Sequence, residues 1–355
     1  MNTWKTNWTQ SRQNYIDWWA GKGTVITMWE AVKKAGAPAH SSLPPYKDLD
    51  QLWFDPTYRA EVIHEFLATT SLKGDILPVA NTQLGPGSMA AILGASLEAR
   101  EDTIWIRHDE NFNGNLRLDP SNKWWQLHLD LLKACKAKAQ GQYYVGCPDL
   151  MEGLDVLASI RGNDSVLMDM MLDPDGLEEQ VKKINEIYFD VFDQLYDIIR
   201  EGDEMAFCYF SIWAPGKCSK FQSDISVMIS EDDFRRFVQP YLREQCQRIP
   251  YSLYHLDGVD AIRHLDAVLE IEELKAVQWT PGYGQPQGGN ACWFDMYKKI
   301  KAAGKSVIPC WVTLDELQPL LDEVGPEGLN IEMDVQTEAE FEQALRIAEA
   351  YNHKS

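Results

Sequence analysis

The feature that most constrains the fold is an alternation of short strand-like runs with longer segments of helical spacing. Runs rich in β-branched and aromatic residues recur eight times, and helix-like segments lie between them. Strand followed by helix, repeated eight times, is typical of an α/β fold of the (β/α)8 TIM-barrel type. The predicted strands are 24–29, 74–79, 142–146, 204–210, 251–256, 274–279, 305–312 and 328–333.

Three of the intervening segments carry clear helix-start signals. Residues 174–199 have acidic residues in their opening turn, and 230–249 and 337–352 begin with Ser230 and Thr337, each followed three residues later by an acidic side chain. The alternation of strand-like and helix-like runs is least regular between residues 80 and 140, so we expect an insertion between strands 2 and 3. No linker-like tract interrupts the chain, which favours one domain over residues 1–355.

The charge balance narrows the classes of partner. The chain has 33 Lys and Arg residues against 54 Asp and Glu residues, a formal net charge of -21, so its field repels nucleic acids and anionic membranes. The start, MNTWKTNWTQ, lacks the apolar core of a signal peptide, and no run approaches the ~18 apolar residues of a membrane span. We therefore expect a soluble, cytoplasmic protein that binds a small molecule. A homodimer is compatible with the sequence but not specified by it.

The strongest candidate for a metal site is the end of the fifth predicted strand. Active sites of TIM barrels lie at the carboxyl ends of the strands, and LYHLDG places His255 and Asp257 there, two residues apart and therefore on one face. The seven cysteines lack a CxxC pair and are expected to be free thiols, and Cys310 closes the seventh strand. His255, Asp257 and Cys310 would supply three ligands of a catalytic zinc and leave the fourth position open. The alternative is a histidine bonded to a carboxylate without a metal.

Other polar and aromatic residues follow the remaining strands. Asp75 precedes the glycine-rich GPG of residues 85–87, and its alternative role is to cap a helix. Glu30 and Glu332 can reach the mouth but are expected to be solvated or capping carboxylates. The thirteen tryptophans include candidates for stacking on a flat ligand. We expect a long loop after the fourth strand to carry Trp213, Gln222 and Asp224, and a Gly/Pro-rich rim after the sixth to carry Gln278, Trp279 and Tyr283.

Four stretches of the chain resemble the uroporphyrinogen decarboxylase superfamily. They are GDILPVANTQLGPGSMAAILGA (74–95), residues 148–174, SDISVMISEDDFRRFVQPYL (223–242), and LYHLDGVDAIRHLDAVLEI (253–271) followed by VQWTPGYG. The match runs in order through most of the chain and implies a (β/α)8 barrel. The superfamily contains the decarboxylase and the zinc-dependent, corrinoid-linked methyltransferases, which need different sites.

The two branches leave different marks on this sequence. The decarboxylase branch implies an N-terminal cluster of arginines that binds a polycarboxylate, and only Arg12 of such a cluster is present here. Asp75 matches the aspartate that this branch uses against the pyrrole nitrogens. Asp224 lies where this branch carries a polar site residue. The methyltransferase branch implies H-x-C and a later cysteine as zinc ligands. Here His255 and Cys310 are kept, and Asp257 replaces the first cysteine, which makes the site harder.

The resemblance therefore favours a zinc-dependent methyltransferase that works with a separate corrinoid protein and a small methyl donor or acceptor. His255, Asp224 and Asp75 are its candidate catalytic residues; Gln222, Trp213, Trp279 and Tyr283 are candidates for substrate binding. The first alternative is a metal-free decarboxylase, a carbon–carbon lyase acting on a pyrrolic or small carboxylated substrate through Asp75. The second is a corrinoid or tetrapyrrole binder without catalytic activity.

Overall fold

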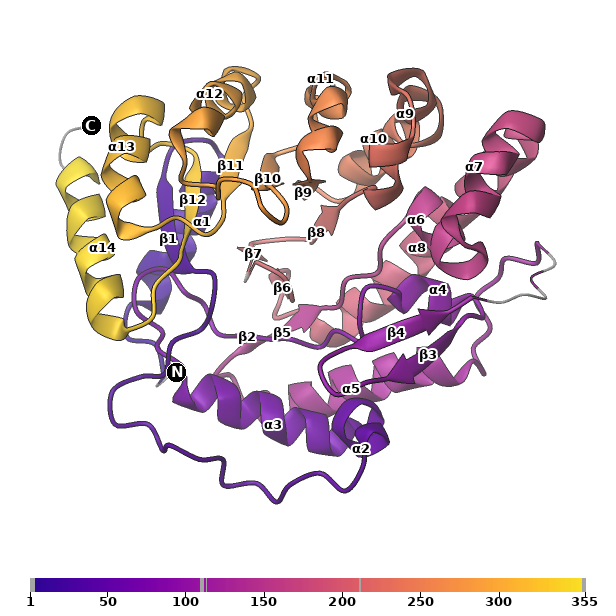
Figure 1. The fold of residues 1–355 in the computed structure, drawn as a ribbon. Helices are drawn as coiled ribbons and strands as arrows, with labels where there is room; N and C mark the ends of the chain where they lie inside the picture. Colours follow the sequence, from indigo (N-terminus) through magenta and orange to yellow (C-terminus); the bar gives the residue numbers. More distant parts are fainter. Residues whose placement is uncertain (1–3, 109–111, 113, 211, 353–355) are drawn as a thin grey trace.

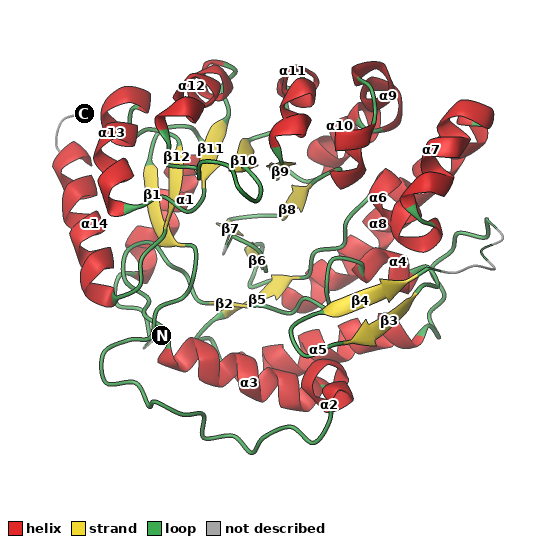
Figure 2. Ribbon diagram, viewed as in Figure 1, coloured by secondary structure: helices red, strands yellow, loops and turns green. Residues whose placement is uncertain are grey.

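The computed structural model describes residues 4–108, 112, 114–210 and 212–352. Helices form an outer layer around a curved inner wall of strands (Figure 1), and the strands converge toward one central mouth (Figure 2). This mixed α/β arrangement agrees with the fold class predicted from the alternation of strands and helices.

The inner wall consists of two sheets of mostly parallel strands. One has the order β1-β12-β11-β10-β9-β8 and the other β2-β5-β6-β7, whereas β3 and β4 form a separate antiparallel hairpin. The first strand pairs with the last, as in a barrel, but strand pairing among the described residues leaves two sheets rather than a closed ring. The strands are β1 (Thr24–Met28), β2 (Val79–Ala80), β3 (Ser96–Ala99), β4 (Ile104–Arg107), β5 (Tyr144–Cys147), β6 (Met205–Phe207), β7 (Trp213–Ala214), β8 (Cys218–Phe221), β9 (Tyr251–Asp257), β10 (Ala276–Thr280), β11 (Ser306–Pro309) and β12 (Leu329–Met333).

Hydrogen bonds join the two sheets where strand pairing stops. The backbone N–H of Asp75 donates to the carbonyl of Ile26 in β1 at 3.0 Å, just ahead of β2. At the opposite junction, the Cys218 thiol of β8 lies 3.9 Å from the carbonyl oxygen of Met205 in β6. The wall therefore continues across both junctions without a regular ladder.

Every predicted strand segment contains or overlaps an observed strand, and the expected insertion is present as the β3–β4 hairpin between β2 and β5. The expected long loop after the fourth strand is wrong, because Trp213–Ala214 form β7 and Cys218–Phe221 form β8. The sequence does not predict β8, because the run Cys-Ser-Lys-Phe lacks apolar alternation. Its Lys220 is buried through an ion pair with Asp149 and not through apolar contacts.

The predicted helices are observed with one difference. Residues 174–199 form one helix, but 230–249 form two, divided at Val238, where Pro240 in the first turn of the second helix has no N–H to continue the first. The helices are α1 (Trp8–Trp19), α2 (Leu49–Phe54), α3 (Pro56–Thr69), α4 (Ser88–Ile92), α5 (Lys123–Ala139), α6 (Gly153–Arg161), α7 (Asn163–Leu172), α8 (Pro174–Ile199), α9 (Glu231–Phe237), α10 (Gln239–Arg248), α11 (Leu265–Leu269), α12 (Phe294–Ala302), α13 (Leu314–Val324) and α14 (Glu338–Asn352), with 3-10 turns η1 (Asp224–Met228), η2 (Val259–His264) and η3 (Ala291–Trp293).

The seven cysteines are free thiols, six of them buried and Cys292 exposed. Within the described residues, no helix has the length and apolar character needed to cross a bilayer. The core fills the space between strands and helices, where α8 alone buries eleven side chains.

A glycine in β5 tests how tightly the wall is packed. A Cβ on Gly146 would lie 2.7 Å from the Ala80 carbonyl oxygen and 2.8 Å from the Cys208 Cα, which are backbone atoms that cannot move aside. A Cβ on Gly216 would meet only the Tyr251 ring, at 3.2 Å. We expect Gly146→Ala to lower the free energy of unfolding by ~1–3 kcal/mol or more, and Gly216→Ala to change it by less than ~0.5 kcal/mol, in urea titrations followed by circular dichroism. Equal midpoints for the two variants would contradict this packing.

Candidate functional site

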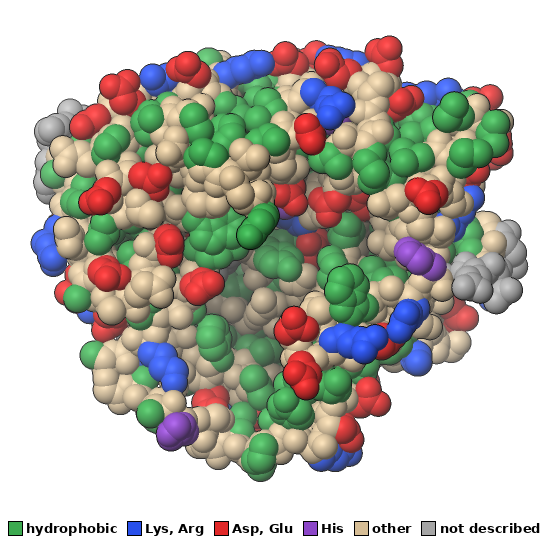
Figure 3. Space-filling model, viewed as in Figure 1, with side chains coloured by type: hydrophobic (Ala, Val, Ile, Leu, Met, Phe, Trp, Pro, Cys, Tyr) green, Lys and Arg blue, Asp and Glu red, His purple; other side chains and the backbone are tan. Residues whose placement is uncertain are grey.

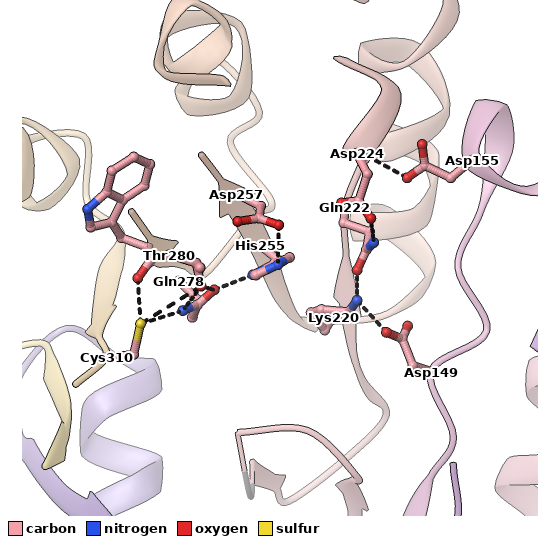
Figure 4. A network of polar contacts seen from close by, with 11 residues as sticks. Asp149, Asp155, Lys220, Gln222, Asp224, His255, Asp257, Gln278, Thr280 and Cys310 are labelled. Atoms are coloured by element: carbon pink, nitrogen blue, oxygen red, sulfur yellow. Dashed lines mark hydrogen bonds and ion pairs between the residues drawn. The ribbon is translucent and has the colours of Figure 1, made fainter. Parts of the chain in front are cut away.

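Polar side chains from four neighbouring strands meet at the mouth. Gln222 follows β8, His255 and Asp257 end β9, Gln278 and Thr280 end β10, and Cys310 follows β11 (Figure 4). In the β9–β10 register, Gln278 pairs with His255 and Thr280 with Asp257, so both pairs lie at matching levels. The same alternation that places His255 and Asp257 on one face directs Leu256 into the core.

Two of these groups, together with Asp224 just after β8, are close enough to hold a metal ion. One ligand atom each from Asp224, His255 and Asp257 lies within 4.8 Å of the other two. The His255 Nε2 is 3.8 Å from Asp257 Oδ2. We call Asp224, His255 and Asp257 the mouth triad.

The orientation of His255 is fixed from behind by Gln278. The ring Nδ1 bonds to the side-chain oxygen of Gln278, whose amide nitrogen donates to Thr280 Oγ1 at 2.9 Å and lies 3.4 Å from the Cys310 sulfur. Because the amide oxygen accepts, Nδ1 carries the proton and Nε2 offers a lone pair toward the mouth. Burial, aided by the charge of Lys220, lowers the pKa of His255 to about 3, so the ring is neutral at physiological pH.

Cys310 is not part of the mouth triad. Its thiol is fully buried, donates to the Trp279 carbonyl at 3.0 Å, and is separated from His255 by the side chain of Gln278. Burial raises the pKa of this thiol well above its ordinary value. Of the three ligands expected from sequence, His255 and Asp257 therefore lie together with Asp224, whereas Cys310 lies behind Gln278.

A buried ion pair holds the other side of the mouth. The Lys220 Nζ in β8 lies 2.6 Å from Asp149 Oδ2 and also donates to the Gln222 side-chain oxygen. Gln222 in turn donates to Asp224 Oδ2 at 2.8 Å. Burial alone would lower the pKa of Lys220, but Asp149 and Glu152 outweigh it and raise that pKa, so the ammonium stays charged. A chain of contacts therefore runs from the buried ion pair to the mouth triad.

Asp224 is positioned through its backbone as well as its side chain. The Asp155 carboxylate in the first turn of α6 accepts from the N–H of Asp224 at 2.7 Å and of Ile225 at 3.0 Å. The Asp224 side chain is open to the concave mouth, yet the surrounding protein displaces much of its water. This desolvation, together with repulsion from Asp155 and Asp257, raises the pKa of Asp224 to about 8.

Asp75 lies apart from the mouth triad and does not face the cavities at the mouth. Its carboxylate accepts from Asn14 Nδ2 at 2.7 Å and from the Ile26 N–H at 3.1 Å, so it ties α1 to β1. Arg12 is also engaged: it pairs with Glu204 and lies over the Trp213 ring. Asp75 and Arg12 are therefore both engaged by neighbouring residues. The decarboxylase alternative would need a free carboxylate at Asp75 or a free guanidinium at Arg12, and the structure offers neither.

The aromatic wall expected from Trp213, Trp279 and Tyr283 is not formed. Trp213 and Trp279 are fully buried in the core, where Trp279 packs against Trp293, and Tyr283 is fully exposed to solvent. Strand alternation explains Trp279: because Gln278 faces the mouth, its neighbour in β10 must face the surrounding helices.

Aromatic residues that the sequence reasoning missed take their place. Trp29 follows β1 and Tyr209 and Phe210 follow β6, and the Phe210 ring lies 5.6 Å from His255 and 6.1 Å from Trp29. Trp29 and Phe210 close the predicted strands 24–29 and 204–210, and Asp149 follows β5 by two residues, so examining every strand end would have found these three. Lys220 lies inside β8, which the sequence does not predict, so it would have been missed. The space-filling view shows a hollow at this face with apolar and acidic side chains around it (Figure 3).

Two cavities open at the mouth. One of about 320 Å³ is lined by residues from the ends of β1, β2, β6 and β12, including Trp29, Phe210 and Glu332; we call it the apolar cavity. A cleft of about 380 Å³ lies beside Asp224 and Asp155, with the exposed Trp105 and Met228 in its wall. Both volumes fall at the lower end of the ~300–1,000 Å³ typical of small-molecule sites.

One solved structure places this fold among known proteins. A methyltransferase from Methanosarcina mazei superposes with a TM-score of 0.60 at 11% sequence identity, covering 97% of this chain and 99% of that chain. No family model matches the sequence. No curated protein matches it either. At 11% identity the likeness shows a shared fold over the whole length.

The buried ion pair should be energetically coupled. Lys220→Met leaves Asp149 as an unpaired buried charge, so we expect a loss of ~3–5 kcal/mol in the free energy of unfolding. The double variant Lys220→Met/Asp149→Leu should be more stable than Lys220→Met alone. Lys298→Met, in the exposed pair with Glu323, is the control and should cost less than ~1 kcal/mol. If Lys220→Met and Lys298→Met have the same chemical-denaturation midpoint, the ion pair does not hold the mouth.

Glu332 should make stability depend on pH. Burial raises the pKa of this carboxyl from 4.5 to about 8, so the folded state holds a proton that the unfolded chain releases. Its stabilising contribution is complete below pH 4.5 and is lost as the pH rises toward 8, with a slope of at most ~1.4 kcal/mol per pH unit. We expect Glu332→Gln to gain stability relative to the wild type between pH 5 and 8, measured by urea titration at each pH. The exposed Glu30→Gln should show no such trend, and parallel pH curves for wild type and Glu332→Gln would refute the assignment.

Proposed function

We propose that this protein is a zinc-dependent methyltransferase related to the uroporphyrinogen decarboxylase superfamily, which transfers a methyl group between a corrinoid on a separate protein and a small molecule. The observation that carries the proposal is the mouth triad, which gathers three metal-ligand groups at the strand ends of the fold. The shared fold with the Methanosarcina mazei methyltransferase supports it.

The donor set of the mouth triad fits a zinc ion. A neutral imidazole nitrogen and two carboxylate oxygens are zinc ligands, and three protein ligands leave a position open for catalysis. The His255–Gln278 bond fits as well, because histidine ligands of zinc donate their second N–H to an oxygen acceptor. When bound, zinc supplies Lewis acidity, which lowers the pKa of a thiol or water beside it.

The surrounding residues then have defined tasks. Gln278 holds the neutral tautomer of His255, and Gln222 holds the Asp224 side chain while Asp155 holds its backbone. The carboxylate of Asp257 in place of a thiolate makes the site harder, which favours oxygen or nitrogen groups over sulfur in the open position. Corrin amides are neutral, so the acidic surface does not repel the partner's cofactor.

Metal analysis and activity test this function together. We expect about one zinc per chain in the purified protein, at least tenfold weaker zinc binding in His255→Ala and Asp257→Asn, and a loss of ~10–100-fold in Gln278→Leu. Methyl transfer from methylcobalamin to a panel of small acceptors, followed by the corrinoid absorbance, should fall in the same order. Cys310→Ser separates the two ligand sets, since it should keep zinc if the mouth triad alone binds it.

His40→Ala and Asp260→Asn are matched controls, because both side chains are exposed and neither belongs to the mouth triad. A protein that binds zinc no more tightly than His255→Ala, and is silent in methyl-transfer assays, would reject the proposal.

A further inference from the structure

The lining of the apolar cavity has one unusual feature, a single carboxyl group among mainly apolar side chains. Its lining comes mainly from aliphatic and aromatic side chains such as Met28, Leu77 and Phe210, and its described lining residues include no Lys, Arg or His. The single carboxyl group in that lining belongs to Glu332. A buried carboxyl in apolar surroundings is costly unless something pairs with it.

Glu332 has no such partner within the described chain. The residue lies next to the last position of β12, is 2% exposed, and its Oε2 makes no hydrogen bond to any described residue. No cationic side chain offsets its burial, in contrast to Asp149, which pairs with Lys220. A ligand in the cavity that Glu332 lines would satisfy this oxygen.

Three observations specify what kind of ligand fits. The polar side chains of Thr70, Ser71 and Asn81 also line the cavity, but each is hydrogen-bonded within the chain. Glu332 is then the charged acceptor that the cavity offers, and one carboxylate cannot replace the several oxygen ligands of an inorganic cation. A primary ammonium has three N–H donors and needs more acceptors than the single free oxygen, whereas a methylated ammonium has one donor or none. Trp29 and Phe210 both line the cavity, with ring centroids 6.1 Å apart, and aromatic rings attract soft cations.

We propose that the apolar cavity binds an N-methylated ammonium ion, with its charge against Glu332 and its methyl groups against Trp29 and Phe210. The long-range field of the chain, at a net charge of -21, draws such cations in. The Phe210 ring separates the cavity from the mouth triad and lies 5.6 Å from the His255 ring. The inference rests on the proposed function in one respect, since it names this class of ion as the methyl donor of the same mouth. The C–N bond would break as the methyl group passes to the reduced corrinoid of the separate protein, and the neutral amine would leave with the electron pair of that bond.

A matched pair of ligands isolates the charge. Choline and 3,3-dimethylbutan-1-ol have nearly the same shape, but only choline is a cation. In titration calorimetry with the full chain, we expect choline to bind at least tenfold more tightly than the alcohol. Glu332→Gln should weaken choline binding at least tenfold and leave binding of the alcohol unchanged, and Trp29→Leu should weaken choline binding about threefold to tenfold.

Glu30→Gln controls for the overall field, because it removes the same charge from an exposed position next to Trp29 that does not line the cavity. It should change choline binding by less than twofold. Equal affinity for the two ligands, no binding of either, unchanged choline binding by a folded Glu332→Gln, or the same loss in Glu30→Gln would each overturn the inference.

These titrations need neither zinc nor turnover, so the two proposals can fail separately. A preference for choline in a protein without zinc or methyl transfer would reject the proposed function alone. A zinc-binding methyltransferase with no preference between the two ligands would reject the inference alone.

Discussion

The mouth depends on one buried ammonium group. Lys220 is the cation among Asp149, Glu152, Asp155 and Asp224, and its bond to Asp149 joins β8 to the segment after β5. Without that charge the carboxylates would have to take up protons or move apart, because burying several like charges is prohibitive. The same Lys220 bonds to Gln222, which holds Asp224, so the geometry of the mouth triad follows from an interaction that contributes no ligand atom itself.

Two sides of the mouth handle negative charge in opposite ways. On the β8–β10 side the carboxylates are bonded to backbone N–H groups, amides and Lys220, which fixes them as a polar cluster. On the β1–β12 side Glu332 lines the apolar cavity, and its Oε2 has no hydrogen-bond partner among the described residues. Phe210, with a positive φ of 56°, lies between them against both His255 and Trp29. Its backbone conformation is uncommon for a side chain of this size, which indicates that the position of this ring is determined by its surroundings.

Periodicity predicted the architecture and half of the site. Apolar runs identify β1, β9, β10, β11 and β12, and the two-residue spacing correctly places His255 and Asp257 on one face. The sequence could not reveal β8, because Lys220 is buried by a partner 71 residues away, nor the meeting of Asp224 with β9, which depends on Asp155 holding its backbone. The wrong prediction that Trp279 faces the mouth has a different cause. Side chains alternate along β10, so Gln278 and Trp279 cannot both face the mouth, and the sequence alone is enough to show this.

At the mouth, the carboxyl groups of this acidic chain are placed where they could bind cations. Burial raises the pKa of both Asp224 and Glu332 to about 8, so near neutral pH these carboxyls hold protons that an arriving cation would displace. The triad offers converging oxygen and nitrogen atoms, which suits a compact metal ion, whereas Glu332 offers one oxygen amid rings and methyl groups, which suits a large, weakly hydrated ion. The two proposed ligands thus follow from one physical cause, the desolvation of carboxyl groups at the mouth, and they differ because the number of converging donors differs at the two sides.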